Sequence, residues 1–165
     1  MEMNYLVLFI AALVPMIIGF IWYGPLFGNT WVNEMNFTKA YLVGQNKVKV
    51  FVICFAVSVF IGAALMQMVI HQMGVYSTLA GEPGFSELTG EAFTLFKDFT
   101  ATYGDRFRTF KHGALHGVLY GVLLVLPILT IQALFERKKF KYIAINAGYW
   151  MVTLAIMGGI ICQWI

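Results

Sequence analysis

Three copies of a polar residue followed by glycine recur every fourth residue in the segment HGALHGVLYG, residues 112–121. The polar residues are His112, His116 and Tyr120. Four residues advance an α-helix by about 400°, so successive copies lie one turn apart on nearly the same face. One stripe of such a helix carries two imidazoles and a phenol, and the adjacent stripe carries only glycines. Imidazole is a metal ligand and an acid–base group, and glycine lets a neighbouring helix approach closely.

His71 is the third histidine of the chain, and it lies near the end of an earlier apolar run. If the helices that carry His71, His112 and His116 touch, three imidazoles converge at one membrane face and form a workable zinc or copper site. Asp105 is a candidate fourth ligand, and a haem would need one histidine from each helix. The spacing alone favours a plainer structural role, without a cofactor, in which these side chains hydrogen-bond to backbone or water. Proton or ion handling is a further alternative.

The composition predicts a membrane protein. Of the 165 residues, 60% are hydrophobic and 12% are charged, whereas a soluble domain carries about 25% charged residues. The apolar runs exceed the ~18 residues that indicate a membrane span. The small net charge of +3, without a basic patch beyond the membrane flanks, indicates no nucleic-acid partner. We expect an all-α, polytopic membrane protein, a single integral membrane domain over residues 1–165 with four transmembrane helices at about 4–23, 50–73, 112–135 and 142–164.

Residues 74–111 form the one long hydrophilic segment, and we expect them to lie outside the membrane. Ser86 is a plausible helix N-cap, and apolar residues recur at helical spacing from there to Tyr103. This pattern predicts a helix of about 17 residues with one aromatic face. The helix is too polar to span a membrane, so it should lie on the membrane surface or cap the four-helix bundle.

Four spans place the loops after the first and third spans on the same side of the membrane. Those loops hold most of the cations of the chain, namely Lys39, Lys47, Lys49, Arg137, Lys138, Lys139 and Lys141. The positive-inside rule therefore predicts a multi-pass protein of the inner (cytoplasmic) membrane, with both termini and residues 74–111 on the non-cytoplasmic side.

Small residues form close-packing faces on three of the spans. They are Ser58, Gly62, Gly113, Gly117, Gly121, Gly158 and Gly159. Because these faces exceed what four helices need for their own packing, the leading hypothesis is a non-enzymatic protein that acts by helix–helix association, as a homo-oligomer or as a subunit of a larger membrane complex. A small-solute or ion transporter or channel is an alternative, although few polar residues fall near the middle of the spans. Asn146 is one of them, and we expect its amide to hydrogen-bond to another helix.

Three segments are distinctive: GFIWYGPLFGNTW at residues 19–31, FKHGALHG at 110–117 and ALFERKKFKYIAINAGYWMVTLAIMGGI at 133–160. In these segments the chain resembles the small bacterial inner-membrane proteins of domain-of-unknown-function family 1761, and the resemblance extends over nearly the whole chain. It implies a four-helix integral membrane protein, and it carries over no activity, cofactor or catalytic residue.

Overall fold

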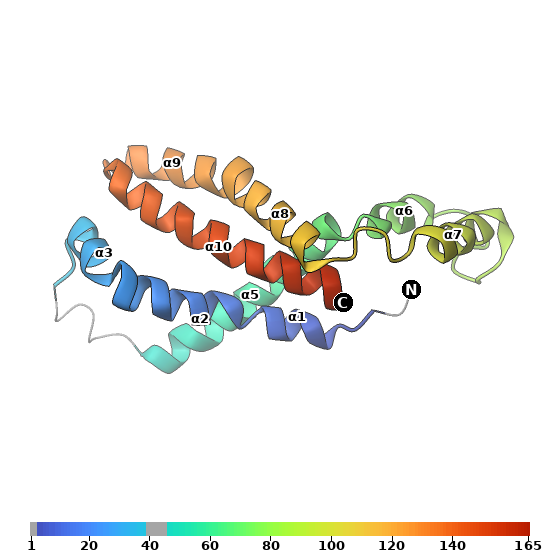
Figure 1. Cartoon of the computed structure of the whole chain (residues 1–165), viewed down its shortest axis with the longest axis horizontal. Coiled ribbons are helices and arrows are strands. Elements are labelled where there is room, and N and C mark those ends of the chain that lie inside the picture. The colour runs from blue at the N-terminus through green and yellow to red at the C-terminus, as the bar shows by residue number, and fades with distance from the viewer. Residues whose placement is uncertain (1–2, 39–45) are drawn as a thin grey trace.

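The structure, a computed structural model, describes residues 3–38 and 46–165 (Figure 1). Helices make up 79% of it, and the described residues contain no strand. Four helical stretches are long and apolar enough to cross a membrane, and we call them spans 1 to 4: Leu6–Leu26, Lys47–Val69, Phe110–Phe135 and Phe140–Trp164. The predicted all-α fold with four candidate spans is therefore confirmed. Lys39, one of the predicted loop cations, lies outside the described residues.

Spans 1 and 3 are each divided into shorter helices. Span 1 consists of α1 (Leu6–Ala11), α2 (Val14–Ile21) and the π-helical turn η1 (Trp22–Leu26), and it is followed by α3 (Gly28–Met35). Span 3 consists of α8 (Phe110–Tyr120), the π-helical turn η2 (Gly121–Val125) and α9 (Leu126–Phe135). Prolines explain the divisions, because Pro15, Pro25 and Pro127 lack the N–H that continues the α-helical ladder.

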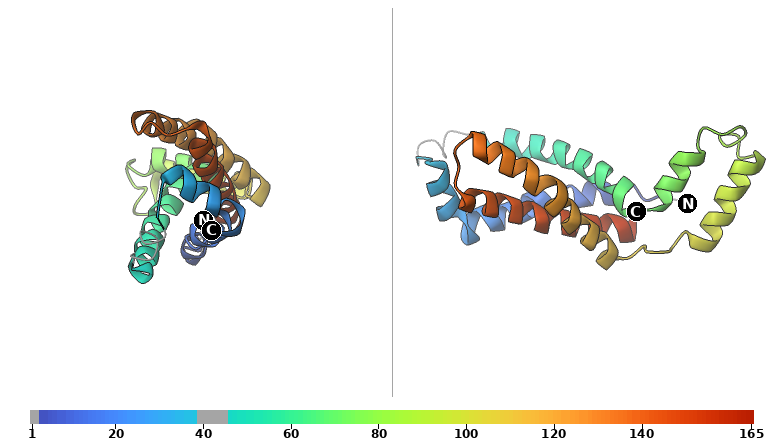
Figure 2. Two further views of the ribbon diagram at one scale, coloured as in Figure 1. Left: turned by 90° about the vertical axis from the view of Figure 1, so that its left-hand side faces the viewer. Right: turned by 90° about the horizontal axis from the view of Figure 1, so that it is seen from above.

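Span 4 is the helix α10 (Phe140–Trp164), and it lies at the centre of the fold. Of its most apolar stretch 56% is buried, against 33% or less in each of the other spans. It contacts α1, α2, α8 and span 2, which is α5 (Lys47–Val69), and Figure 2 shows it between the other spans. Met157 and Ile161 of α10 form one buried cluster with Val69 and Ala11. The outer spans leave many large apolar side chains exposed, as expected for helices that face lipid.

The segment between spans 2 and 3 forms a helical hairpin that projects beyond the ends of the spans (Figures 1 and 2). Its helices are α6 (Gln72–Leu79) and α7 (Gly90–Tyr103), and we call residues 72–103 the hairpin. The rings of Tyr76, Phe85 and Phe96 meet edge to face, with centroids 5.6–5.7 Å apart. The predicted aromatic face of α7 thus packs within the hairpin.

Two predicted helix boundaries are wrong. Span 2 ends at Val69 and not at residue 73, because Ile70 leaves the helical conformation (φ −106°, ψ 92°) and α6 then begins as a separate helix. The helix predicted from Ser86 starts at Gly90 and has 14 residues. Leu88 and Gly90 have positive φ, and the Thr89 N–H donates to the Gly84 carbonyl at 2.8 Å, so the preceding residues form a turn.

Trp22 and Tyr23 hold the end of span 1 against α10. The Trp22 Nε1–H donates to the carbonyl of Ile145 at 3.0 Å, and the Tyr23 hydroxyl donates to Asn146 Oδ1 at 2.9 Å. The predicted hydrogen bond between Asn146 and another helix is therefore confirmed.

Removing the Tyr23 hydroxyl is expected to have a small, measurable effect. Tyr23→Phe should lower the free energy of unfolding in detergent by about 0.6 kcal/mol, the average for a hydrogen bond between membrane helices. Tyr5→Phe is the matched control, because the exposed Tyr5 hydroxyl donates to the nearby Met3 sulfur at 3.7 Å and does not join two spans. Equal free energies of unfolding for the two variants would show that the Tyr23 bond contributes nothing.

Candidate metal centre

The three histidines of the chain lie together at the end of the spans next to the hairpin. His71 occupies the corner between α5 and α6, and His112 and His116 lie one turn apart on α8. One ring nitrogen from each histidine lies within 4.8 Å of those of the other two. The centroids of the His112 and His116 rings are 4.5 Å apart, and the His71 ring is 5.0 Å from each. The group is open on one side, since His71 is exposed.

The spacing of the nitrogens suits a small metal ion. The Nε2 atoms of His71 and His112 are 2.9 Å apart and share a hydrogen bond. Two imidazole nitrogens bound tetrahedrally to zinc, at about 2.0–2.1 Å each, are separated by about 3.3 Å. For this pair a shift of a few tenths of an ångström makes room for an ion in place of the shared proton, and the His116 nitrogen, within 4.8 Å of the other two, must move closer to complete the site. His116 supplies the third ligand, and among the described residues no other histidine, cysteine, aspartate or glutamate joins the group.

A haem does not fit this arrangement. A porphyrin needs a flat slot between its two axial ligands, and the three imidazoles are already in ring contact. Asp105, the predicted fourth ligand, is not part of the group. It lines a separate cavity with Thr100, Gly104 and Arg108. The structure thus offers three imidazole nitrogen donors, and the group is open on the side of His71.

The start of α8 is held by side-chain hydrogen bonds that position the two histidines. The Thr109 hydroxyl accepts from the His112 N–H at 3.3 Å, as an N-cap does. The Arg108 guanidinium donates to the carbonyls of Cys162 at 2.7 Å and Ile165 at 2.6 Å, at the end of α10. The Arg108 bonds attach the residues just before α8 to the end of the central helix.

The glycine stripe of α8 packs directly on α10. A Cβ at Gly113 would overlap the carbonyl of Gly158, and a Cβ at Gly117 would overlap the carbonyl of Leu154. A Cβ at Gly121 would lie 2.7 Å from Met151 Cγ. Because the backbones touch along this stripe, the adjacent histidine stripe is held in one orientation.

The remaining small residues also pack inside the chain. A Cβ at Gly62 would lie 2.8 Å from the Leu8 side chain, and one at Gly159 would lie 2.6 Å from the Phe110 ring. Ser58 is buried, and its hydroxyl donates to the carbonyl of Cys54 at 2.7 Å. Every small residue that the sequence singles out thus has its contact within this chain.

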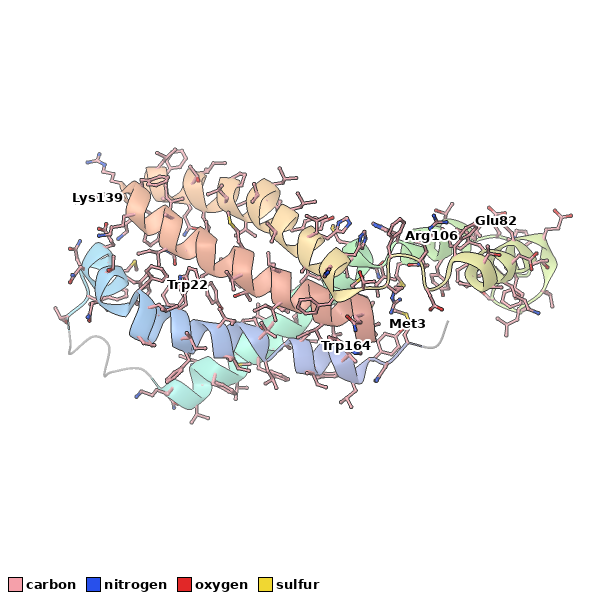
Figure 3. All side chains as sticks on the ribbon, viewed as in Figure 1. Met3, Trp22, Glu82, Arg106, Lys139 and Trp164 are labelled. Carbon is pink, nitrogen blue, oxygen red and sulfur yellow. The ribbon has the colours of Figure 1, made fainter. Side chains whose placement is uncertain are left out.

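Phe107 covers one side of the histidines. Its ring stacks on His112 at a centroid distance of 5.1 Å and an interplanar angle of 23°, and it meets His71 edge to face at 6.3 Å. Its φ of 65° places Phe107 in the left-handed region, a backbone conformation that costs a residue with a side chain roughly 1–2 kcal/mol. Figure 3 places the neighbouring Arg106 at the junction of the spans and the hairpin.

The family model for a protein of unknown function, DUF1761, matches residues 6–162, nearly the whole chain. The chain belongs to this family. No curated protein and no solved structure matches it. The match confirms the resemblance found in the sequence, and as a DUF1761 protein the chain acquires no assigned activity from its relatives. Its chemistry has to be inferred from the histidine group itself.

The sequence identifies the three histidines of this DUF1761 protein but not the residues around them. Gln72 is buried, and its Nε2 donates to the carbonyls of Tyr103 and Arg106, each at 2.9 Å. No local sequence pattern predicts that Gln72 hydrogen-bonds to residues more than 30 positions away. No local pattern predicts that Phe107 adopts left-handed backbone beside the histidines.

Proposed function

We propose that this DUF1761 protein binds a single first-row transition-metal ion, with zinc as the reference case, at the membrane face. His71, His112 and His116 are the ligands, and the fourth position is open to water or to a second molecule. The observation that carries the proposal is the convergence of three imidazole nitrogens within 4.8 Å, one from the corner that follows span 2 and two from span 3. Neutral imidazole is a preferred ligand of zinc, copper and nickel.

The packing of the glycines favours this proposal over helix–helix association. The association hypothesis rests on glycine faces in excess of what the chain needs. Gly113, Gly117 and Gly121 pack against α10, and Gly62 and Gly159 against other side chains of the same chain. These faces are therefore covered, and they supply no argument for a homo-oligomer or for a larger complex.

The proposal includes an orientation. The basic loop that contains Lys139 lies at the end of the spans opposite the hairpin (Figure 3). The positive-inside rule then places that loop in the cytoplasm and the histidine group, with the hairpin, on the non-cytoplasmic side of the inner membrane. The metal site would thus face metal ions that arrive from outside the cytoplasm.

Cobalt titration of the purified protein tests the proposal. We expect saturation at one ion per chain and visible ligand-field absorption from nitrogen donors. His71→Ala removes the only ligand from outside α8, and we expect it to weaken binding by about 100-fold or more, since even indirect changes at metal sites cost 10–100-fold.

Gln67→Ala is the control for this titration. Gln67 is an exposed residue of α5, the helix that leads to His71, and it lies outside the histidine group. It should bind cobalt as the unaltered chain does. A titration without a saturating spectral change in the unaltered chain would refute the proposal.

A further inference from the structure

Two crossings of the chain connect the hairpin to the spans, and the proposed metal site lies between them. The first crossing is Ile70–His71, between α5 and α6. The second is the linker from Gly104 to Thr109, between α7 and α8. His71 belongs to the first crossing, and Phe107, which stacks on His112, belongs to the second. A ligand bound by the histidines therefore contacts the first attachment directly through His71 and reaches the second only through the stack of His112 on Phe107.

Polar contacts hold Phe107, in the second crossing, in its left-handed backbone conformation. Gln72 Nε2 donates to the carbonyls of Tyr103 and Arg106, on either side of a turn that ends at Phe107. The Cys162 sulfur of α10 lies 3.3 Å from the carbonyls of both Phe107 and Val69, so its single S–H is shared between the linker and the end of α5. The left-handed backbone is unfavourable for phenylalanine by itself. These contacts and the stack on His112 therefore keep Phe107 in place.

A groove of about 270 Å³, open to the surface, lies on one side of the crossing and is lined by His71, Gln72, Phe99, Tyr103, Arg106 and Phe107. Because the groove is open, the orientation of the hairpin on this side depends on the contacts around Phe107.

We propose that Phe107 is a positioning residue that couples the metal site to the hairpin. An ion bound by the three histidines fixes the His112 ring, the fixed ring holds Phe107, and Phe107 holds the linker that orients the hairpin. Metal binding thereby narrows the range of hairpin orientations. This inference rests on the proposed function, and it adds a structural consequence that metal binding alone does not require.

Pulsed electron spin resonance measurements of the distance between two spin labels, with and without zinc, test the coupling. One spin label is placed on the exposed native Cys54 of α5 and the other on Leu95→Cys, an exposed position of α7. Cys162 is fully buried and should escape labelling. Zinc is expected to narrow the distance distribution of the otherwise unaltered chain. In Phe107→Gly, which keeps all three ligands and suits the left-handed backbone, the narrowing should be lost and zinc affinity should fall about 10-fold.

Two further variants separate coupling from general effects. Phe107→Tyr keeps the ring and should restore the narrowing. Leu88→Gly is the matched control, because Leu88 is also left-handed (φ 59°) but lies in the turn between α6 and α7. It should keep both the zinc affinity and the narrowing. If the unaltered chain binds zinc without narrowing, or Phe107→Gly narrows equally, the coupling is refuted and the metal site stands. If the unaltered chain binds no zinc, both proposals fail.

Discussion

A chain that carries both His112→Ala and His116→Ala is expected to lose all stabilisation by zinc. An ion that binds only the folded chain raises the free energy of unfolding by about 2.7 kcal/mol at 100 times its dissociation constant. The double variant keeps one ligand, His71, which is exposed and alone cannot hold an ion at that concentration. Thermal unfolding in detergent, with zinc and with a chelator, measures the difference.

Tyr120→Phe is the control for the double histidine variant, because Tyr120 is the third polar residue of the same stripe of α8 and is not part of the ligand group. It should show the full stabilisation by zinc. An equal zinc-dependent rise in the melting temperature of the double histidine variant and the unaltered chain would exclude these histidines as the ligands.

Gly117→Ala is expected to produce the largest loss of stability. The added methyl group would overlap the backbone carbonyl of Leu154 and lie 2.7 Å from Ala155 Cα, and neither atom can move without displacing α10. The two helices must then separate where they are closest. We expect the free energy of unfolding to fall by about 3 kcal/mol or more, at the upper end of overpacking effects.

Gly74→Ala gives the matched comparison for this substitution. Gly74 lies in α6, and a Cβ there would have no atom within 4 Å. The same chemical change should therefore raise the stability of the helix by up to about 1 kcal/mol, through helix propensity alone. Denaturant unfolding of both variants measures the difference, and a Gly117→Ala chain as stable as the Gly74→Ala chain would show that α8 and α10 are not in backbone contact.

The spans and the histidine group were predictable because their signals are local or topological. Apolar runs define the spans, and two successive spans that cross in opposite directions place the end of the first, near His71, and the start of the second, at His112, on the same side. The glycines of α8 were predictable as a packing stripe, but the sequence did not show that their partner is α10 of the same chain. The packing partner is decided by the three-dimensional arrangement of the helices, and the spacing of the glycines along the sequence does not reveal that arrangement.

The structure around Phe107 could not be predicted, for a physical reason. Phenylalanine has no local preference for left-handed backbone, so its φ follows from distant contacts with Gln72 and Cys162. The break at Ile70 is similar, because neither Ile70 nor the His71 and Gln72 that follow it is a glycine or proline stop signal. Both departures from local preference lie beside the histidines, where strained or irregular backbone is expected at functional sites.

X-ray absorption spectroscopy of the zinc-loaded chain tests the central claim most directly, because it counts the ligands of the ion. The account predicts three imidazole nitrogens at about 2.0–2.1 Å and one further light atom. One imidazole or none, or a sulfur at about 2.3 Å, would contradict it and would show that the ion binds away from His71, His112 and His116.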